Sequence, residues 1–214
     1  MNSAQTSLSI DQSDYFNFAV DDVDRIQGNP DVMDAAMNEA AYAIANKADQ
    51  YIASLYTDVS AINRKGDDTT PISISSSTDA YDKLVDLSTL LTKQNVPVPG
   101  RWIIVPPEYE NYLLKDLRFV GYGTQPNLER LTNGIIGRAA GFDILVSNNV
   151  PNTSSAKYKI IAGHRMAWSY ANQVNQLEAY RPEKRFGDAM KGLHLYGAKV
   201  IRPNALALMT TSFA

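Results

Sequence analysis

The sequence predicts an α+β fold in which one long helix lies beside an antiparallel β-hairpin, with a separate unit of mixed sheet and helices in the middle of the chain. Three observations predict it. Residues 31–56 carry one continuous apolar helix face, residues 101–105 form a short apolar run typical of a buried strand, and the chain from Gln176 onward has the texture of strands. A length of 214 residues suffices for one large domain or two small ones.

The first predicted strand ends at an acidic run that begins with Asp21. Phe16, Phe18 and Val20 alternate with polar or small residues before it, which is the two-residue period of a strand. The ten residues at the start of the chain are small and polar and carry no basic segment followed by an apolar one, so they do not resemble a signal peptide.

The long helix is predicted at 30–56. Asn29 is a good N-cap and Pro30 suits the first helical position. Neither glycine nor proline interrupts residues 31–56, and apolar side chains recur there at spacings of three and four: Met33, Met37, Ala40, Ile44, Ala48, Tyr51 and Leu55. We therefore expect Ile44 and Tyr51 to face the hairpin and to be buried.

The middle of the chain is predicted to alternate helices with short strands. The polar stretch 63–78 is the expected boundary between subdomains, and Thr78 is the expected cap of the next helix. The predicted helices span 78–94 and 106–117, and the predicted strands span 101–105, 142–147, 158–162 and 167–171.

The C-terminal part is predicted to be β-structure. Strands at 176–181 and 190–201 flank a polar turn, as in an antiparallel hairpin. Arg202-Pro203 interrupts the second of these strands, and residues 205–209 form a last apolar strand.

Composition excludes several classes of protein. The chain has no cysteine, which excludes disulfides, Cys-based zinc sites and iron–sulfur clusters. A net charge of −3 argues against a dedicated nucleic-acid binder held by phosphate neutralisation. No segment approaches the roughly 18 apolar residues of a membrane helix, so the expected compartment is the cytoplasm.

Two segments resemble ligand-binding motifs and fail on inspection. The cluster Asp21-Asp22-Val23-Asp24 suggests a calcium loop, but in a loop counted from Asp22 the fifth and sixth positions are Ile26 and Gln27, where a ligand and a glycine are needed. The glycine-punctuated segment 134–141 has neither the spacing nor the lysine of a phosphate-binding loop, and it precedes a strand rather than following one. We expect no metal and no cofactor, and a turn or close-packing role for 134–141.

No catalytic constellation is recognisable. His164 and His194 lie beside or within predicted strands, where lone histidines are usually hydrogen-bonded structural residues. The sequence has no nucleophile elbow and no HExxH helix, and no pair of carboxylates stands out. We therefore expect a structural or assembly protein and no enzyme, with no catalytic residue assigned.

The candidate contact residues form a small basic cluster at the tip of the C-terminal hairpin. Arg181, Lys184 and Arg185 lie in its predicted turn region. Three cations on an acidic protein are a weak nucleic-acid site, because affinity for DNA depends on neutralising many phosphates. We interpret them as candidate subunit contacts.

Four stretches, in order, resemble the major capsid proteins of tailed bacteriophages, which share the Hong Kong 97-like fold. They are residues 15–24 with the helix after them (Ala40 to Ala45 and Asp49 to Tyr51), residues 101–108 with 113–116, residues 133–144 with 147–151, and residues 191–200. Together they extend over nearly the whole chain.

This resemblance implies a division into domains. Residues 1–12 would be the remnant of an extended loop, and 13–77 with 176–203 the peripheral domain, with 30–56 as its spine helix. Residues 78–175 with 204–214 would be the axial domain. The resemblance leaves the family's N-terminal arm and the first half of its extended loop without a counterpart, because Met1 comes only about a dozen residues before the first strand; we therefore expect these 214 residues alone to be a monomer or small oligomer.

The resemblance also implies a role. Copies of such a chain would form pentamers and hexamers of an icosahedral shell around double-stranded DNA, bound without sequence specificity. Scaffold or decoration proteins would be possible partners, no membrane would be involved, and the protein would pass from the host cytoplasm into the virion.

Two other functions remain open. A shell of the encapsulin type has the same fold but encloses protein cargo. A hydrolase with an unrecognised carboxylate site is the alternative from a different class, and a cleft with convergent carboxylates of perturbed pKa would support it.

Overall fold

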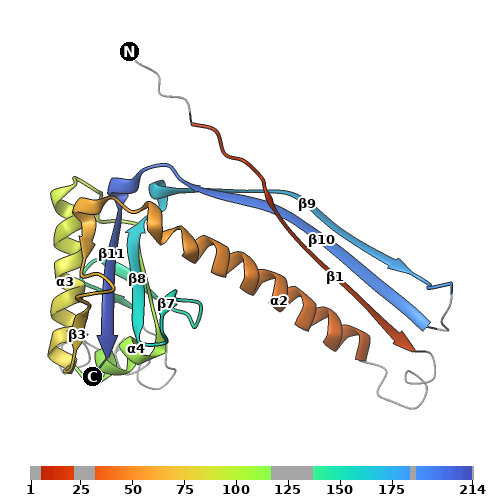
Figure 1. Ribbon diagram of the computed structural model, residues 1–214, viewed down its shortest axis with the longest axis horizontal. Helices are drawn as coiled ribbons and strands as arrows, with labels where there is room; N and C mark the ends of the chain where they lie inside the picture. Colours follow the sequence, from red (N-terminus) through yellow and green to blue (C-terminus); the bar gives the residue numbers. More distant parts are fainter. Residues whose placement is uncertain (1–5, 22–31, 117–136, 184–186, 214) are drawn as a thin grey trace. The chain divides into compact units, whose positions relative to one another are not determined.

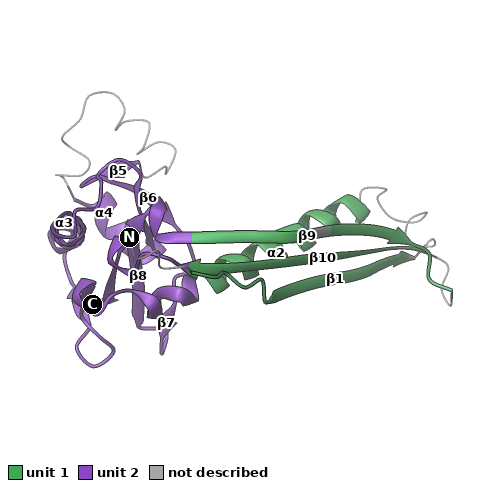
Figure 2. Cartoon of the chain, turned by 90° about the horizontal axis from the view of Figure 1, so that it is seen from above, with its two compact units in different colours: residues 1–52, 169–199 green, residues 53–168, 200–214 purple. Residues whose placement is uncertain are grey.

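The computed structural model describes residues 6–21, 32–116, 137–183 and 187–213. The chain divides into two compact units, each described here by itself. Unit 1 comprises Met1–Ile52 with Ser169–Lys199, and unit 2 comprises Ala53–Trp168 with Val200–Ala214 (Figure 2).

Unit 1 is built from one long helix along a three-stranded sheet of order β1-β10-β9 (Figure 1). The strands are β1 (Gln12–Asp21), β9 (Trp168–Tyr180) and β10 (Gly187–Val200), and the helix is α2 (Val32–Ser54). β1 pairs antiparallel with β10 from Gln12 opposite Tyr196 to Asp21 opposite Gly187. β9 and β10 are neighbours joined by a short connection, so they form the expected hairpin.

The helix agrees with its predicted apolar face. All seven positions from Met33 to Leu55 that the spacing singled out are at least partly buried, and a 3₁₀ turn, Leu55–Asp58, follows α2. Their burial is less than expected, because Ile44 and Tyr51 are only half-buried and Ala48 is the one fully buried member of the set. A single helix resting on three strands has no second layer to enclose its large side chains.

The hairpin contains one continuous strand where the sequence predicted two. β9 runs from Trp168 to Tyr180, through the polar stretch between the predicted strands 167–171 and 176–181. Asn172 and Gln173 lie in this stretch and are exposed. An exposed strand needs no apolar alternation, so the pattern that detects half-buried strands did not detect it.

Two glycines of β10 allow other parts of unit 1 to approach closely. A Cβ on Gly197 would lie 2.2 Å from the carbonyl oxygen of Ser9, and a Cβ on Gly192 would lie 2.2 Å from the ring of Phe16. The segment before β1 therefore crosses β10 at Gly197, where the Lys199 Nζ also donates to the carbonyl of Ser7 at 2.6 Å.

Unit 2 is built on an eight-stranded mixed sheet of order β2-β11-β8-β4-β6-β5, with β3 beside β11 and β7 beside β8. The strands are β2 (Arg64–Lys65), β3 (Ile72–Ile74), β4 (Arg101–Val105), β5 (Arg138–Ala139), β6 (Phe142–Val146), β7 (Asn152–Thr153), β8 (Lys157–His164) and β11 (Leu206–Phe213). β8 runs antiparallel to both β11 and β4, whereas β4 and β6 are parallel.

Segment 53–77 contributes to this sheet through β2 and β3, which both pair with β11. The contact boundary between the units therefore lies at Ile52 and Ala53, before the polar stretch 63–78 where the sequence placed a boundary. Val59 and Ile74 from this segment belong to the core of unit 2.

Helices α3 (Ser77–Lys93) and α4 (Pro107–Leu114) pack with the sheet of unit 2. Four residues of α3, spaced along one face, are fully buried: Ala80, Leu84, Leu87 and Leu91. The N-cap of α3 is Ser76, not Thr78 as predicted. The Ser76 hydroxyl accepts from the Asp79 backbone N–H and the Asp79 carboxylate accepts from the Ser76 N–H, each at 3.2 Å, which closes a capping box that Thr78 could not form.

The glycine-punctuated segment is described only from Gly137 onward, and that part is a tight hairpin. Ala139 pairs with Phe142, and Ala140 and Gly141 between them have φ values of 48° and 86°. Two consecutive positive φ angles are typical of a two-residue hairpin turn. The predicted turn role is confirmed for this part of the segment.

Candidate functional site

Of the basic cluster predicted at the hairpin tip, the structure describes Arg181 alone. Arg181 directly follows β9 and is exposed. Lys184 and Arg185 lie outside the described residues, so the grouping of the three side chains stays a prediction. The structure adds that the tip lies at the end of a 13-residue strand.

A polar cluster joins the helix of unit 1 to its sheet. The Asp14 carboxylate of β1 accepts from the Lys47 Nζ of α2 at 3.3 Å and from the Tyr196 Oη of β10 at 2.8 Å. Tyr196 is 2% exposed. Its burial, together with the bond to Asp14, raises the pKa of the phenol well above its usual range. This cluster fixes the position of β1 relative to α2.

Aromatic rings surround Tyr196 within the same unit. The ring centroid of Tyr51 lies 5.7 Å away in an edge-on arrangement, that of Tyr170 lies 6.2 Å away, and that of His194 lies 4.7 Å away in a stack. The Oη of Tyr170 is 3.4 Å from the His194 Nε2. Partial loss of hydration, with the charge of Asp49, raises the pKa of Tyr170. Tyr51 therefore faces the hairpin as predicted, through an aromatic contact.

His164 and His194 differ in how many of their ring nitrogens form hydrogen bonds. The Met166 backbone N–H donates to the His164 Nδ1 at 3.2 Å, so the His164 Nε2 carries the proton and donates to the Pro99 carbonyl at 2.9 Å. This confirms the structural role predicted for His164. The Nδ1 of His194 is buried and has no hydrogen-bond partner among the described residues, although its ring is packed against Tyr196.

Large apolar side chains are exposed on unit 1. Tyr15 of β1 is 79% exposed, Tyr42 of α2 is 74% exposed and Leu177 of β9 is 56% exposed. Tyr15 and Leu177 lie on predicted strands, yet the alternation that predicts a strand does not tell which apolar residues remain uncovered. These side chains are available for contacts with another protein.

A buried arginine forms hydrogen bonds with carbonyls at and just after the C-terminal end of α3 in unit 2. The Arg101 guanidinium donates to the carbonyls of Ser88, Val96 and Pro97 at 3.1, 2.5 and 3.0 Å. Arg101 has no exposed surface, and this burial lowers its pKa. Its role is structural, because a cation at a helix C-terminus satisfies the last carbonyls and opposes the helix dipole. The sequence signal for such a buried arginine is its position as the first residue of an apolar strand.

A buried lysine ties a loop to β8, an inner strand of the sheet in unit 2. Lys159 of β8 is 4% exposed, and its Nζ pairs with the Asp68 carboxylate and lies 3.5 Å from the Thr210 Oγ1. The bond from Lys159 holds the pKa of Asp68 below its usual range. The sequence does not single out either residue, because residues 91 apart form no recognisable pattern.

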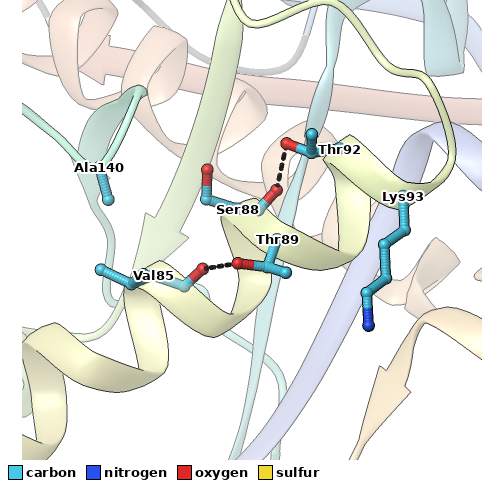
Figure 3. A pocket seen from close by; sticks show the side chains of 6 residues that line it. All are labelled: Val85, Ser88, Thr89, Thr92, Lys93 and Ala140. Carbon is cyan, nitrogen blue, oxygen red and sulfur yellow. Dashed lines mark hydrogen bonds between the residues drawn. The ribbon is translucent and has the colours of Figure 1, made fainter.

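The pocket beside α3 is lined by three hydroxyl groups and one lysine (Figure 3). Its lining comprises Val85, Ser88, Thr89, Thr92, Lys93 and Ala140. The Thr89 hydroxyl donates to the Val85 carbonyl at 3.0 Å and the Thr92 hydroxyl to the Ser88 carbonyl at 2.9 Å. These two threonine hydroxyls are bonded within the helix, whereas the Ser88 Oγ accepts from the Arg101 Nη1 at 3.3 Å.

Two other kinds of site are absent from the described residues. Within the ranges that the structure describes, no three His, Asp or Glu side chains are grouped so as to hold a metal ion. None of the described helices is long and apolar enough to cross a membrane.

Comparison with known proteins gives a consistent result. The family model described as phage capsid protein matches residues 5–209. A solved chain from Mycobacterium phage Che8 is 31% identical with a TM-score of 0.74, over 98% of this chain and 76% of that chain. No curated protein sequence matches the chain significantly.

More distant solved structures share the fold. The capsid of cyanophage P-SCSP1u matches with 17% identity and a TM-score of 0.72, over 100% of this chain and 78% of that chain. The holo-SrpI encapsulin of Synechococcus elongatus matches with 12% identity and a TM-score of 0.66, over 96% of this chain and 74% of that chain. The predicted Hong Kong 97-like fold is confirmed, and it occurs in both kinds of shell.

Proposed function

This chain belongs to the family of phage capsid proteins, and we therefore propose that its copies assemble into a closed icosahedral shell around the double-stranded DNA of a tailed phage. The observation that carries the proposal is the family match over residues 5–209. The exposed aromatic side chains of unit 1 support it, because a subunit that makes contacts with several neighbours needs uncovered apolar surface.

The two units correspond in this proposal to the two domains of such a subunit. Unit 1, with α2 as its spine helix and the β9–β10 hairpin beside it, is the peripheral domain. Unit 2, with its mixed sheet and the helices α3 and α4, is the axial domain around the five- and six-fold axes. The hairpin tip with Arg181, Lys184 and Arg185 contacts a neighbouring subunit.

In this proposal the shell encloses the DNA without binding it tightly. A net charge of −3 gives the subunit no overall attraction for phosphate, so DNA is packed without sequence-specific binding. Mature protein resides in the virion and free subunits in the host cytoplasm, where scaffold and decoration proteins are candidate partners. The role is structural and involves no reaction.

Microscopy of the protein expressed from its full gene tests the proposal. Negative-stain images and sedimentation velocity should show closed particles of megadalton mass. Particles taken from phage lysates should contain nuclease-protected DNA. Protein that never forms particles would overturn the shell role, and particles that contain a folded protein cargo in place of DNA would favour the encapsulin alternative.

A further inference from the structure

A cleft in unit 2 combines an arginine with several amides. It has a volume of about 440 Å³ and lies where the end of α3 meets the two short 3₁₀ turns that flank β8 and β11. Its polar lining residues are Gln94, Asn95, Arg202 and Asn204, and its apolar lining residues include Val96 and Met166.

The guanidinium of Arg202 is almost unused within the described chain. Its one hydrogen bond goes to the Met166 sulfur at 3.4 Å, and a thioether is a weak acceptor. No carboxylate of the described residues pairs with it. The side-chain amides of Gln94, Asn95 and Asn204 are likewise without a partner among the described residues. Several donors therefore line one cleft without a protein partner among the described residues, and Asn95, Arg202 and Asn204 are exposed.

The walls of the cleft are held by buried interactions. The Asn63 Nδ2 donates to the carbonyls of Asn204 and Leu206, each at 2.9 Å. The Arg101 guanidinium holds the Val96 carbonyl at 2.5 Å. The Arg202 backbone N–H donates to the Ala167 carbonyl at 3.2 Å. A site whose walls are fixed in this way loses little conformational entropy when it binds.

The charge around the cleft is positive. Lys93 and Arg165 adjoin the lining residues Gln94 and Met166 in the chain, and neither has an acidic partner in the described part. The C-terminus of α3 carries the negative end of a helix dipole, which by itself disfavours an anion. The buried guanidinium of Arg101 lies on that terminus and offsets it.

We propose that the Arg202 cleft binds a carboxylate side chain of a second copy of this chain. A guanidinium fork with neighbouring amide donors matches the two oxygens of a carboxylate. This contact rests on the proposed function, since a shell needs heterologous contacts that join two different surfaces of identical copies.

The composition of the chain favours a protein carboxylate over a nucleic-acid phosphate. Acidic residues outnumber basic ones, 23 to 20. Asp58 and Glu110 are described carboxylates without a cationic partner in the described part of the chain, so copies carry both halves of the pair unused. One cleft on an acidic subunit cannot supply the many phosphate contacts on which DNA affinity depends.

Charge reversal in the protein expressed from its full gene tests the contact. Arg202→Glu should lower the yield of assembled particles at least tenfold, measured by sedimentation velocity at equal protein concentration. Lys65→Glu is the matched control, because Lys65 is an exposed cation of unit 2 with the same charge change and no ionic partner in the described chain. It should assemble like wild type, and both variants should melt like wild type.

Zero-length crosslinking identifies the partner. Arg202→Lys keeps the charge and introduces an amine that a carbodiimide couples to a carboxylate in contact with it. In particles assembled from mixed light- and heavy-nitrogen protein, mass spectrometry should find residue 202 linked to an Asp or Glu of the other isotope.

The outcomes separate the two levels of the proposal. If wild-type protein forms particles and Arg202→Glu forms them in equal yield, this contact alone is overturned. So would a crosslink that joins only peptides of the same isotope, or an Arg202→Glu variant that assembles normally but encloses less DNA, which would assign the cleft to phosphate. Wild-type protein that never assembles would overturn the proposed function and this contact with it.

Discussion

Two charged side chains, Arg101 and Lys159, organise much of the local structure in unit 2. Both are buried, with 0% and 4% of their surfaces exposed. Each buried charge has partners inside the fold: carbonyls at and just after the end of α3 for Arg101, and the Asp68 carboxylate for Lys159. Removing Arg101, or removing the Asp68 partner of the buried Lys159, leaves a buried polar group without that bond, which is costly.

Replacement of Arg101 should therefore destabilise the protein. Arg101→Met keeps the apolar stem but removes the guanidinium donors from the carbonyls of Val96 and Pro97 and one of the donors to the Ser88 carbonyl, and we expect a loss of about 2–3 kcal/mol in the free energy of unfolding. Urea denaturation followed by circular dichroism measures it. Arg138→Met is the control, because Arg138 forms an exposed ion pair with Asp143 at 2.9 Å, and such pairs contribute about 0–1 kcal/mol. Equal losses in the two variants would contradict the role given to Arg101.

The pair of Asp68 with Lys159 should make stability depend on pH. The pKa of Asp68 is lower in the folded chain than in the unfolded chain, so its contribution is fully present above the unfolded value of about 3.9 and is lost as pH falls through the folded value. Asp68→Asn should thus be less stable than wild type at pH 7, and the difference should disappear in strong acid. Urea titrations at a series of pH values measure both curves. A constant difference across the series would show that the pair contributes through shape and not through charge.

Among the elements, α2 shows how a correctly predicted face can carry little burial. Ile44 lines an open groove of unit 1 together with Phe16 of β1 and Leu177 of β9, so it faces the sheet as the spacing predicted. It is nevertheless half-buried. The helix gains its position from the ion pair of Lys47 with Asp14 and from the ring of Tyr51 against Tyr196 as well as from apolar packing.

A charge introduced on this face of α2 should lower the free energy of unfolding less than a charge introduced in an enclosed core. Ile44→Asp should lower the free energy of unfolding by about 1–3 kcal/mol, because the new carboxylate keeps part of its hydration. Thermal unfolding by circular dichroism measures the effect. Tyr42→Asp on the exposed side of the same helix is the control and should melt close to wild type. An Ile44→Asp protein that melts like this control would show that the face of α2 is not packed on the sheet.

Across the molecule as a whole, the two units differ in how much core they enclose. The core cluster of buried apolar side chains draws on α3, α4 and most strands of unit 2. In unit 1 few large side chains are fully buried, and Tyr196 is the largest of them among the described residues. Unit 1 should therefore depend on contacts made in an assembly for much of its stability.

Hydrogen exchange should report this difference directly. In the unassembled chain, amides of α2 should exchange roughly tenfold faster than amides of α3, because local opening of α2 exposes less apolar surface. Assembly should slow exchange in α2 more than in α3. Mass spectrometry of peptides from both helices gives the rates, and equal protection of the two helices in the free chain would refute the argument.

Local sequence patterns were sufficient to predict the fold class, the apolar face of α2, the buried strand at 101–105 and the hairpin in the C-terminal part. These features leave periodic traces, because one side of each element meets a core while the other meets water. The ordered resemblance of four stretches also predicted the capsid family, and the family match over residues 5–209 confirms it.

Which side chains meet depends on the tertiary fold and could not be predicted from such patterns. Lys159 finds Asp68 and Lys47 finds Asp14 across long stretches of chain, and neither pair follows a spacing rule. The length of β9 likewise escaped the pattern, because its exposed middle needs no apolar alternation. The Arg202 cleft is of the same kind: its donors come from the end of α3 and from the turn before β11, and only folding brings unused donors from distant segments to one place.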